Sequence, residues 1–200
     1  RRTRKPRGAT HRRRVRELGS CEFVGTEFGA APLLPRFLRL MTDVSARPGG
    51  SFPESCGDWA STKAAYRFLD NEKVTSDGMM QAHFERVVAR CREKPEVLVI
   101  TDTSEFDYST HEATVGLGPI TSKSRRGIMV HPSYAVTPEG EELGFVGLHT
   151  WTRDEEGFGD RRLRSRTLPT EQKESAKWLR SHEAATRLQR AVGPGPKVTL

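Results

Sequence analysis

A continuous apolar run at residues 97–100 constrains the fold of this 200-residue chain more than any other feature. The run, Val97-Leu98-Val99-Ile100, follows Pro95 and leads directly into Asp102. An uninterrupted run of this length is typical of a strand buried on both faces. Because side chains alternate along a strand, Asp102 is expected on the face of Ile100, with Thr101 and Thr103 on the other. The pattern therefore predicts a carboxylate at the polar end of a rigid strand.

Helical spacing dominates the residues before that strand. A broken stripe from Phe23 to Met41 ends at the Pro and Gly residues of 47–50, which are typical of a loop. A second helix is predicted from Trp59 to Leu69, capped by Asp58. Apolar residues from Met79 to Cys91 recur every three or four positions and predict a third helix, which Thr75 or Ser76 can cap, with His83 packed on its apolar side.

The residues after Asp102 predict strands, one helix and a final strand. Strand patterns cover 127–137 and 143–151, and the turn residues 138–141 indicate an antiparallel hairpin. Residues 153–169 are expected to form an exposed loop, followed by a helix from Thr170 and a strand beginning at Lys197. The candidate buried positions of this helix are Ala176, Trp178, Leu179, Ala184 and Leu188; Trp151 and Trp178 are interpreted as core anchors. Helices followed by this strand pattern indicate an α/β chain with a mixed sheet.

The positive charge is concentrated at the start of the chain. The formal net charge is +7, but nine of the 33 basic residues lie in residues 1–16, and the other 24 accompany 26 acids. A basic tail over residues 1–20 is expected to be unstructured and could contact phosphates by counterion release, although such runs are often only solvated. No run approaches the roughly 18 apolar residues of a membrane span. The three separated cysteines are interpreted as free thiols in a reducing cytoplasm.

Asp102 is the main candidate for chemistry. A carboxylate fixed at the end of a buried strand suits a magnesium ligand, because it is held on rigid backbone and is partly desolvated. The alternative is that Asp102 only caps the following turn with its side chain.

Several blocks of sequence resemble DDE transposases of the insertion-sequence-four family, the group that includes the transposase of transposon five. Val97 to Ser109 resembles the family's first catalytic strand, and Gly57 to Thr75 resembles its N-terminal DNA-binding region. Gly116 to His131 resembles the segment before the second strand, and Lys173 to Trp178 the helix before the second catalytic Asp. These blocks occur in the family's order from about Phe28 to the end of the chain.

The resemblance implies a ribonuclease-H-like fold in which two Asp and one Glu bind two Mg²⁺ or Mn²⁺ ions for phosphoryl transfer on DNA. After the basic tail at 1–20, it implies a helical DNA-binding domain at 21–92 and the first, truncated part of the catalytic domain at 93–200, with an incomplete sheet. Asp102 would be the first catalytic Asp, and the second would follow Leu200, so we expect this chain alone to be inactive. The complete enzyme is expected to bind double-stranded transposon ends as a homodimer in the bacterial cytoplasm, at the nucleoid.

Two basic groups are candidate DNA contacts. Lys63 and Arg67 are four residues apart on a predicted helix and could straddle phosphates, and the resemblance adds Tyr66. The loop residues Lys123, Arg125 and Arg126 could bind phosphate near Asp102, and the resemblance adds His131. For both groups the alternative is a solvated surface without a ligand.

Three other interpretations remain open. The chain could be a nonenzymatic DNA-binding module, a degenerate inactive transposase remnant, or a ribonuclease-H-like nuclease without end recognition.

The segment Ala31 to Arg36 departs from the family pattern and contains Pro32 and Pro35. We expect these two prolines to disturb the N-terminal helix.

Overall fold

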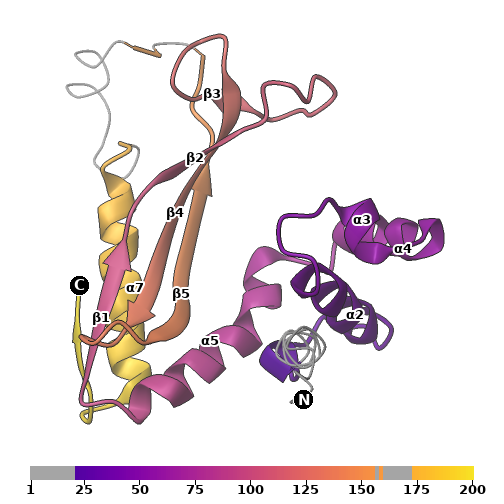
Figure 1. The fold of residues 1–200 in the computed structure, drawn as a ribbon. Coiled ribbons are helices and arrows are strands. Elements are labelled where there is room, and N and C mark those ends of the chain that lie inside the picture. Colours follow the sequence, from indigo (N-terminus) through magenta and orange to yellow (C-terminus); the bar gives the residue numbers. More distant parts are fainter. Residues whose placement is uncertain (1–20, 156–157, 160–172) are drawn as a thin grey trace, which may run out of the picture. The chain divides into compact units, whose positions relative to one another are not determined.

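A computed structural model describes residues 21–155, 158–159 and 173–200. The chain divides into two compact units, residues 1–86 and 87–200, and the division falls within one helix. The expected tail at 1–20 and the predicted helix start at Thr170 lie outside the described residues. The α/β class is confirmed, because helices in the N-terminal unit precede a six-stranded mixed sheet (Figure 1).

The first unit is built from α2 (Leu33–Ser45), α3 (Phe52–Cys56), α4 (Trp59–Leu69) and the start of α5 (Ser76–Arg92). Its core is aromatic. The rings of Phe37 and Phe68 stack with centroids 5.6 Å apart, and Phe28 meets both edge-on. Other members of the core are Leu33, Leu40, Cys56 and Ala65.

The helix starts follow from capping. Asp58 accepts a hydrogen bond from the Ser61 amide at 2.8 Å, and Thr75 accepts one from the Gly78 amide at 3.1 Å, as predicted. The short helix α3 was not predicted, although Ser51 and Glu54 form a capping box around it.

The expectation that two prolines disturb the N-terminal helix is wrong. Pro32 is the N-cap residue of α2, and Pro35 is its third residue. Amide groups in the first turn have no acceptor within the helix, so proline costs no hydrogen bond there. The helix continues to Ser45 with Leu33, Phe37 and Leu40 buried.

The second unit is organised around β4 (Arg126–Val136). This strand pairs antiparallel with β1 (Glu96–Thr101), β2 (Ser104–Asp107), β3 (Gly118–Pro119) and β5 (Glu142–Trp151). The last strand, β6 (Lys197–Thr199), pairs parallel with β1. The predicted hairpin between β4 and β5 is confirmed: the Thr137 amide donates to the Glu141 carbonyl at 2.9 Å.

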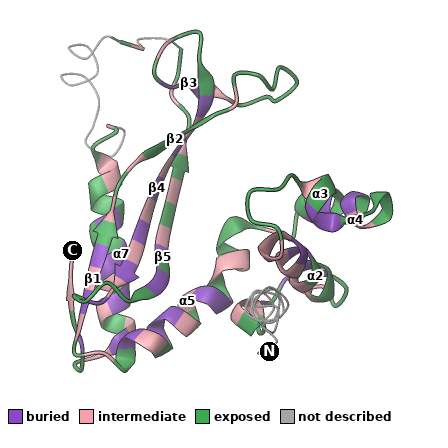
Figure 2. Cartoon of the chain, viewed as in Figure 1, coloured by how far each residue is buried: buried purple, intermediate pink, exposed green. Residues whose placement is uncertain are grey.

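Helix α7 (Ala176–Val192) lies along one face of the sheet (Figure 1). Its buried residues are Ser181, Ala184, Ala185, Leu188 and Val192, marked purple in Figure 2. Two predicted core positions are wrong, because Trp178 is 50% exposed and Leu179 is 49% exposed. They lie in the first turn of α7, before the part of the helix that is buried against the sheet.

The prediction that β1 is buried on both faces is also wrong. Val97 and Val99 are buried, whereas Ile100 is 53% exposed. Side chains alternate along the strand, and the buried face is the one that meets α7 through Thr101 and Ser181. Within the described residues, the opposite face therefore exposes apolar side chains, with Phe145 and Leu148 on β5 also exposed.

Candidate nucleic-acid interface and metal-binding carboxylate

The outward side of α4 carries the candidate DNA contacts of the first unit. Thr62, Ala65 and Phe68 are buried and fix the helix on its core. Lys63, Tyr66 and Arg67 are all exposed. Lys63 and Arg67 are one turn apart, so the ammonium group of Lys63 and the guanidinium group of Arg67 lie on one side of the helix, as predicted. Neither forms an ion pair with any residue that the structure describes, so both charges face solvent.

Tyr66 is held in place by the neighbouring short helix. Its ring meets the ring of Phe52 edge-on, with centroids 6.0 Å apart, while 51% of the residue remains exposed. At the start of α4, hydrogen bonds from Ser61 are the main cause that lowers the pKa of Asp58, and the charge of Arg39 contributes. The α4 surface is therefore a preorganised face with basic and aromatic side chains.

The comparison with known protein families bears on this unit. Residues 19–74 match the family model for the transposase DNA-binding domain. The match includes α2, α3 and α4 and thus the whole exposed face of α4. It supports the prediction of a DNA-binding transposase. No helix in the described parts of the chain is both long and apolar enough to cross a membrane.

Asp102 lies where the sheet is interrupted. The register pairs Thr101 with Ser133 and Ser104 with Val130, so Asp102 and Thr103 lie opposite Pro132 and His131. Proline has no amide proton to donate, so the hydrogen-bond ladder cannot be complete at this point. Asp102 is exposed rather than partly desolvated, which corrects that expectation. Its Oδ1 accepts a hydrogen bond from the Thr103 amide at 2.7 Å, the local contact that the capping alternative requires.

A buried hydroxyl and imidazole network holds the residues on both sides of Asp102. Thr101 Oγ1 lies 2.7 Å from Nε2 of His131, and Thr103 Oγ1 lies 2.8 Å from Nδ1. Ser181 Oγ, on α7, lies 3.0 Å from the same Nε2. His131 is 1% exposed, so the predicted DNA contact of His131 does not fit its position under α7.

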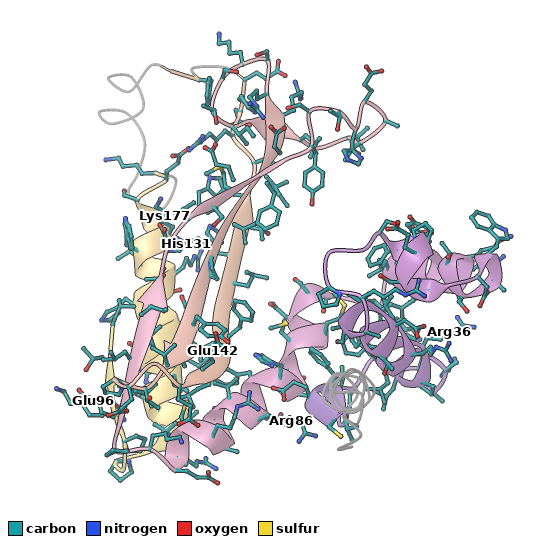
Figure 3. The ribbon with its side chains drawn as sticks, in the orientation of Figure 1. Arg36, Arg86, Glu96, His131, Glu142 and Lys177 are labelled. Carbon is teal, nitrogen blue, oxygen red and sulfur yellow. The ribbon has the colours of Figure 1, made fainter. Side chains whose placement is uncertain are left out.

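Lys177 extends this network toward the surface, as Figure 3 shows beside His131. Its Nζ donates a hydrogen bond to Thr103 Oγ1 at 2.8 Å and lies 5.5 Å from the ring centroid of Trp178. Burial is the main cause that lowers the pKa of His131, and the charge of Lys177 acts in the same direction. A lowered pKa favours the neutral imidazole, in which one ring nitrogen donates and the other accepts.

The basic loop before β4 is largely neutralised by acids. Arg125 forms an ion pair with Asp107, and Arg126 forms one with Glu155. Hydrogen bonds from Ser109, together with Arg125, lower the pKa of Asp107 to about 2. Lys123 is exposed and forms no ion pair with any described residue. Of the three predicted phosphate contacts in this loop, Lys123 alone keeps its charge uncompensated.

Sequence reasoning missed the residues that connect distant segments. Lys177 and Ser181 reach the strand from 74 and 80 positions away, and spacing along the chain carries no signal of such contacts. Arg153 was also missed; it pairs with both Glu105 and Glu174. The exposed Trp59 could have been found, because it lies at helical spacing from Lys63 and Tyr66.

Proposed function

We propose that this chain is part of a cut-and-paste DNA transposase of the insertion-sequence-four family. In this proposal the first unit binds transposon ends, and Asp102 is the first of three carboxylates for metal-dependent phosphoryl transfer. The observation that carries the proposal is the position of Lys63 and Arg67. Both charges are exposed on α4, inside the segment that matches the transposase DNA-binding model.

The electrostatics of α4 favour a polyanionic partner. Each uncompensated Lys or Arg that meets a phosphate releases counterions, and this release drives association. Two such groups one turn apart on a rigid helix reach neighbouring phosphates without first breaking an ion pair. Double-stranded DNA at the ends of the element is the proposed partner.

The second unit supports a catalytic assignment through the place of Asp102. The carboxylate follows a strand anchored by Val97 and Val99, and His131 bonds to the residues on both sides of it. A fixed, accessible carboxylate is the kind of oxygen ligand that Mg²⁺ and Mn²⁺ prefer. The proposal also includes the fold: the mixed sheet and α7 would form part of a ribonuclease-H-like domain.

Asp102 fits one ligand position of a divalent ion, but not a whole site. The described residues contain no group of three or more Asp, Glu, His or Cys side chains placed to hold a metal. The proposed second Asp and the Glu would have to complete the set, and the proposed homodimer would assemble on DNA in the cytoplasm. The ion would activate the attacking oxygen and stabilise the leaving one.

The second candidate function is a nonenzymatic DNA-binding module or inactive transposase remnant. The exposure of Asp102 and its hydrogen bond to the Thr103 amide favour it, because both are explained by a turn without a metal. This candidate predicts DNA binding that needs neither Asp102 nor a divalent ion.

Two measurements test the proposal. Duplexes of about 30 base pairs, roughly three helical turns, would be selected from a random pool by the chain and remeasured by fluorescence anisotropy. Enrichment of one sequence, with binding weakened by Lys63→Ala and Arg67→Ala, is expected. Failure to bind any duplex would overturn the DNA-binding part.

The catalytic part requires the complete reading frame that contains this sequence. We expect Asp102→Asn to abolish strand cleavage in Mg²⁺ while leaving duplex affinity unchanged. Asp107→Asn is the matched control, since that carboxylate is paired with Arg125 and is given no metal role. Normal cleavage by the Asp102→Asn enzyme would favour the nonenzymatic candidate.

A further inference from the structure

Trp59 exposes its indole to an unusual degree. The residue is 74% exposed, although α4 has a well-formed buried side of Thr62, Ala65 and Phe68. Large aromatic side chains normally contribute to a core or to an interface, because leaving them in water forgoes a large hydrophobic gain. Within its unit, Trp59 contributes little to the core, so its indole is available for an external contact.

Helical geometry places Trp59 beside the candidate DNA contacts. Successive residues are separated by about 100° around a helix. Trp59, Lys63, Tyr66 and Arg67 therefore share one side of α4, about 100° wide, which we call the α4 stripe. The N-cap bonds from Ser61 to Asp58 hold the first turn in which Trp59 lies.

We propose that Trp59 contacts duplex DNA through its indole, while Lys63 and Arg67 of the same stripe bind phosphates. This inference rests on the proposed DNA-binding function of α4. The indole packs against deoxyribose and base edges, where it buries apolar area and excludes water. Its contribution to affinity therefore comes from packing and not from charge.

The charge of the α4 stripe selects DNA over other occupants. Lys63 and Arg67 have no ion-pair partner among the described residues, and both lie within one turn of an exposed aromatic ring. A polyanion with apolar sugar and base surfaces matches both kinds of side chain. A second copy of the same stripe would instead bring like charges together.

The salt dependence of binding separates the two kinds of contact. Anisotropy would be measured with the whole chain and the selected duplex at several salt concentrations. We expect Trp59→Ala to weaken binding about tenfold at every concentration, because the indole contributes buried apolar area, with no change in the slope of log K against log salt, because it contributes no charge. Lys63→Ala should instead lower that slope by about one. Trp59→Phe should recover part of the affinity.

Leu69→Ala is the matched control. Leu69 is 39% exposed on the same helix and lies about 60° beyond the Tyr66 edge of the α4 stripe, on the side of the buried Thr62 and Ala65, so this variant should bind as the wild type does. A circular dichroism spectrum and melting curve unchanged in Trp59→Ala would show that the helix is intact.

Tryptophan emission gives a direct second readout. In a Trp151→Phe/Trp178→Phe background, Trp59 is the sole tryptophan, and duplex addition should shift its emission and protect it from iodide. A background that retains only Trp178 serves as the comparison.

Wild-type affinity in Trp59→Ala, with weakened Lys63→Ala, would overturn the inference and leave the proposed function standing. Absence of duplex binding by the wild type would overturn both. If Trp59→Ala changed self-association in sedimentation but not DNA affinity, the stripe would be a protein contact and the inference would be wrong.

Discussion

Thr103 Oγ1 lies 2.8 Å from Nδ1 of His131, and this contact joins the residue after Asp102 to a buried imidazole. Thr101 completes the arrangement on the other side, through Nε2. One side chain therefore restrains the backbone before and after the candidate carboxylate.

Replacing His131 should destabilise the second unit. In His131→Phe, the buried hydroxyl of Ser181 and the partly buried hydroxyls of Thr101 and Thr103 lose their shared partner, which costs about 2–4 kcal/mol. Urea unfolding followed by Trp151 and Trp178 emission, in a Trp59→Phe background, measures the free energy of unfolding. His182→Phe on the exposed side of α7 should change it little. Equal effects of the two variants would contradict the role of the network.

The stability of the second unit should fall as the solution is acidified. Burial lowers the pKa of both His131 and His149 in the folded chain. Below the unfolded value of about 6.5, the unfolded chain binds protons that the folded chain does not. Stability is thus complete at neutral pH and is lost between pH 6.5 and the lower folded pKa values.

Urea unfolding at a series of pH values between 5 and 7.5, about the range in which an unperturbed His titrates, tests this expectation. A His131→Asn variant should show a smaller loss on acidification than the wild type. The same slope in both proteins would mean that His131 does not contribute. His149→Asn separates the second contribution.

Removing one core ring should unfold the first unit. Phe68 is fully buried and stacks on Phe37, so Phe68→Ala leaves a cavity that costs about 3–5 kcal/mol. We expect lost helicity and lost duplex binding together. Leu69→Ala, at the next position, removes an exposed side chain and serves as the control. A cooperative melt of Phe68→Ala near that of the wild type would contradict this packing.

Close packing of α7 on β5 should make Gly147 intolerant of a side chain. A Cβ at Gly147 would lie 2.9 Å from Cβ of Ala184. Gly147→Ala should therefore cost about 1–3 kcal/mol, and the double variant with Ala184→Gly should recover part of that loss. Thermal melts of the wild type, the two single variants and the double variant measure the coupling free energy between positions 147 and 184. This coupling is zero if the two residues do not touch.

Local sequence signals predicted much of the secondary structure. Asp58 and Thr75 cap the helices they were expected to cap, and residues 138–141 form the predicted turn. Apart from the two prolines at the start of α2 and the unpredicted helix α3, the errors concern burial. Ile100 and Trp178 are apolar, but which face of a strand or turn of a helix is covered depends on neighbours distant in sequence.

In the candidate site, too, local sequence predicted what one helix determines and did not predict what distant neighbours determine. Lys63 and Arg67 share one side of α4 because the helical repeat requires it. The neutralisation of Arg125 by Asp107, and the burial of His131 under α7, depend on which strands pair and in what register. No spacing rule for one segment contains that information.

The role of β4 as common partner has a consequence for the order of assembly. During synthesis β1 and β2 are complete before β4 exists. Among the described strands, the other partner of β1 is β6, which also follows β4 in the sequence. The early strands therefore wait with open hydrogen-bonding edges, the state in which a nascent chain is most prone to aggregate. When residues 126–136 arrive, β4 can pair with β1, β2 and β3 at once, and β5 and β6 are added afterwards.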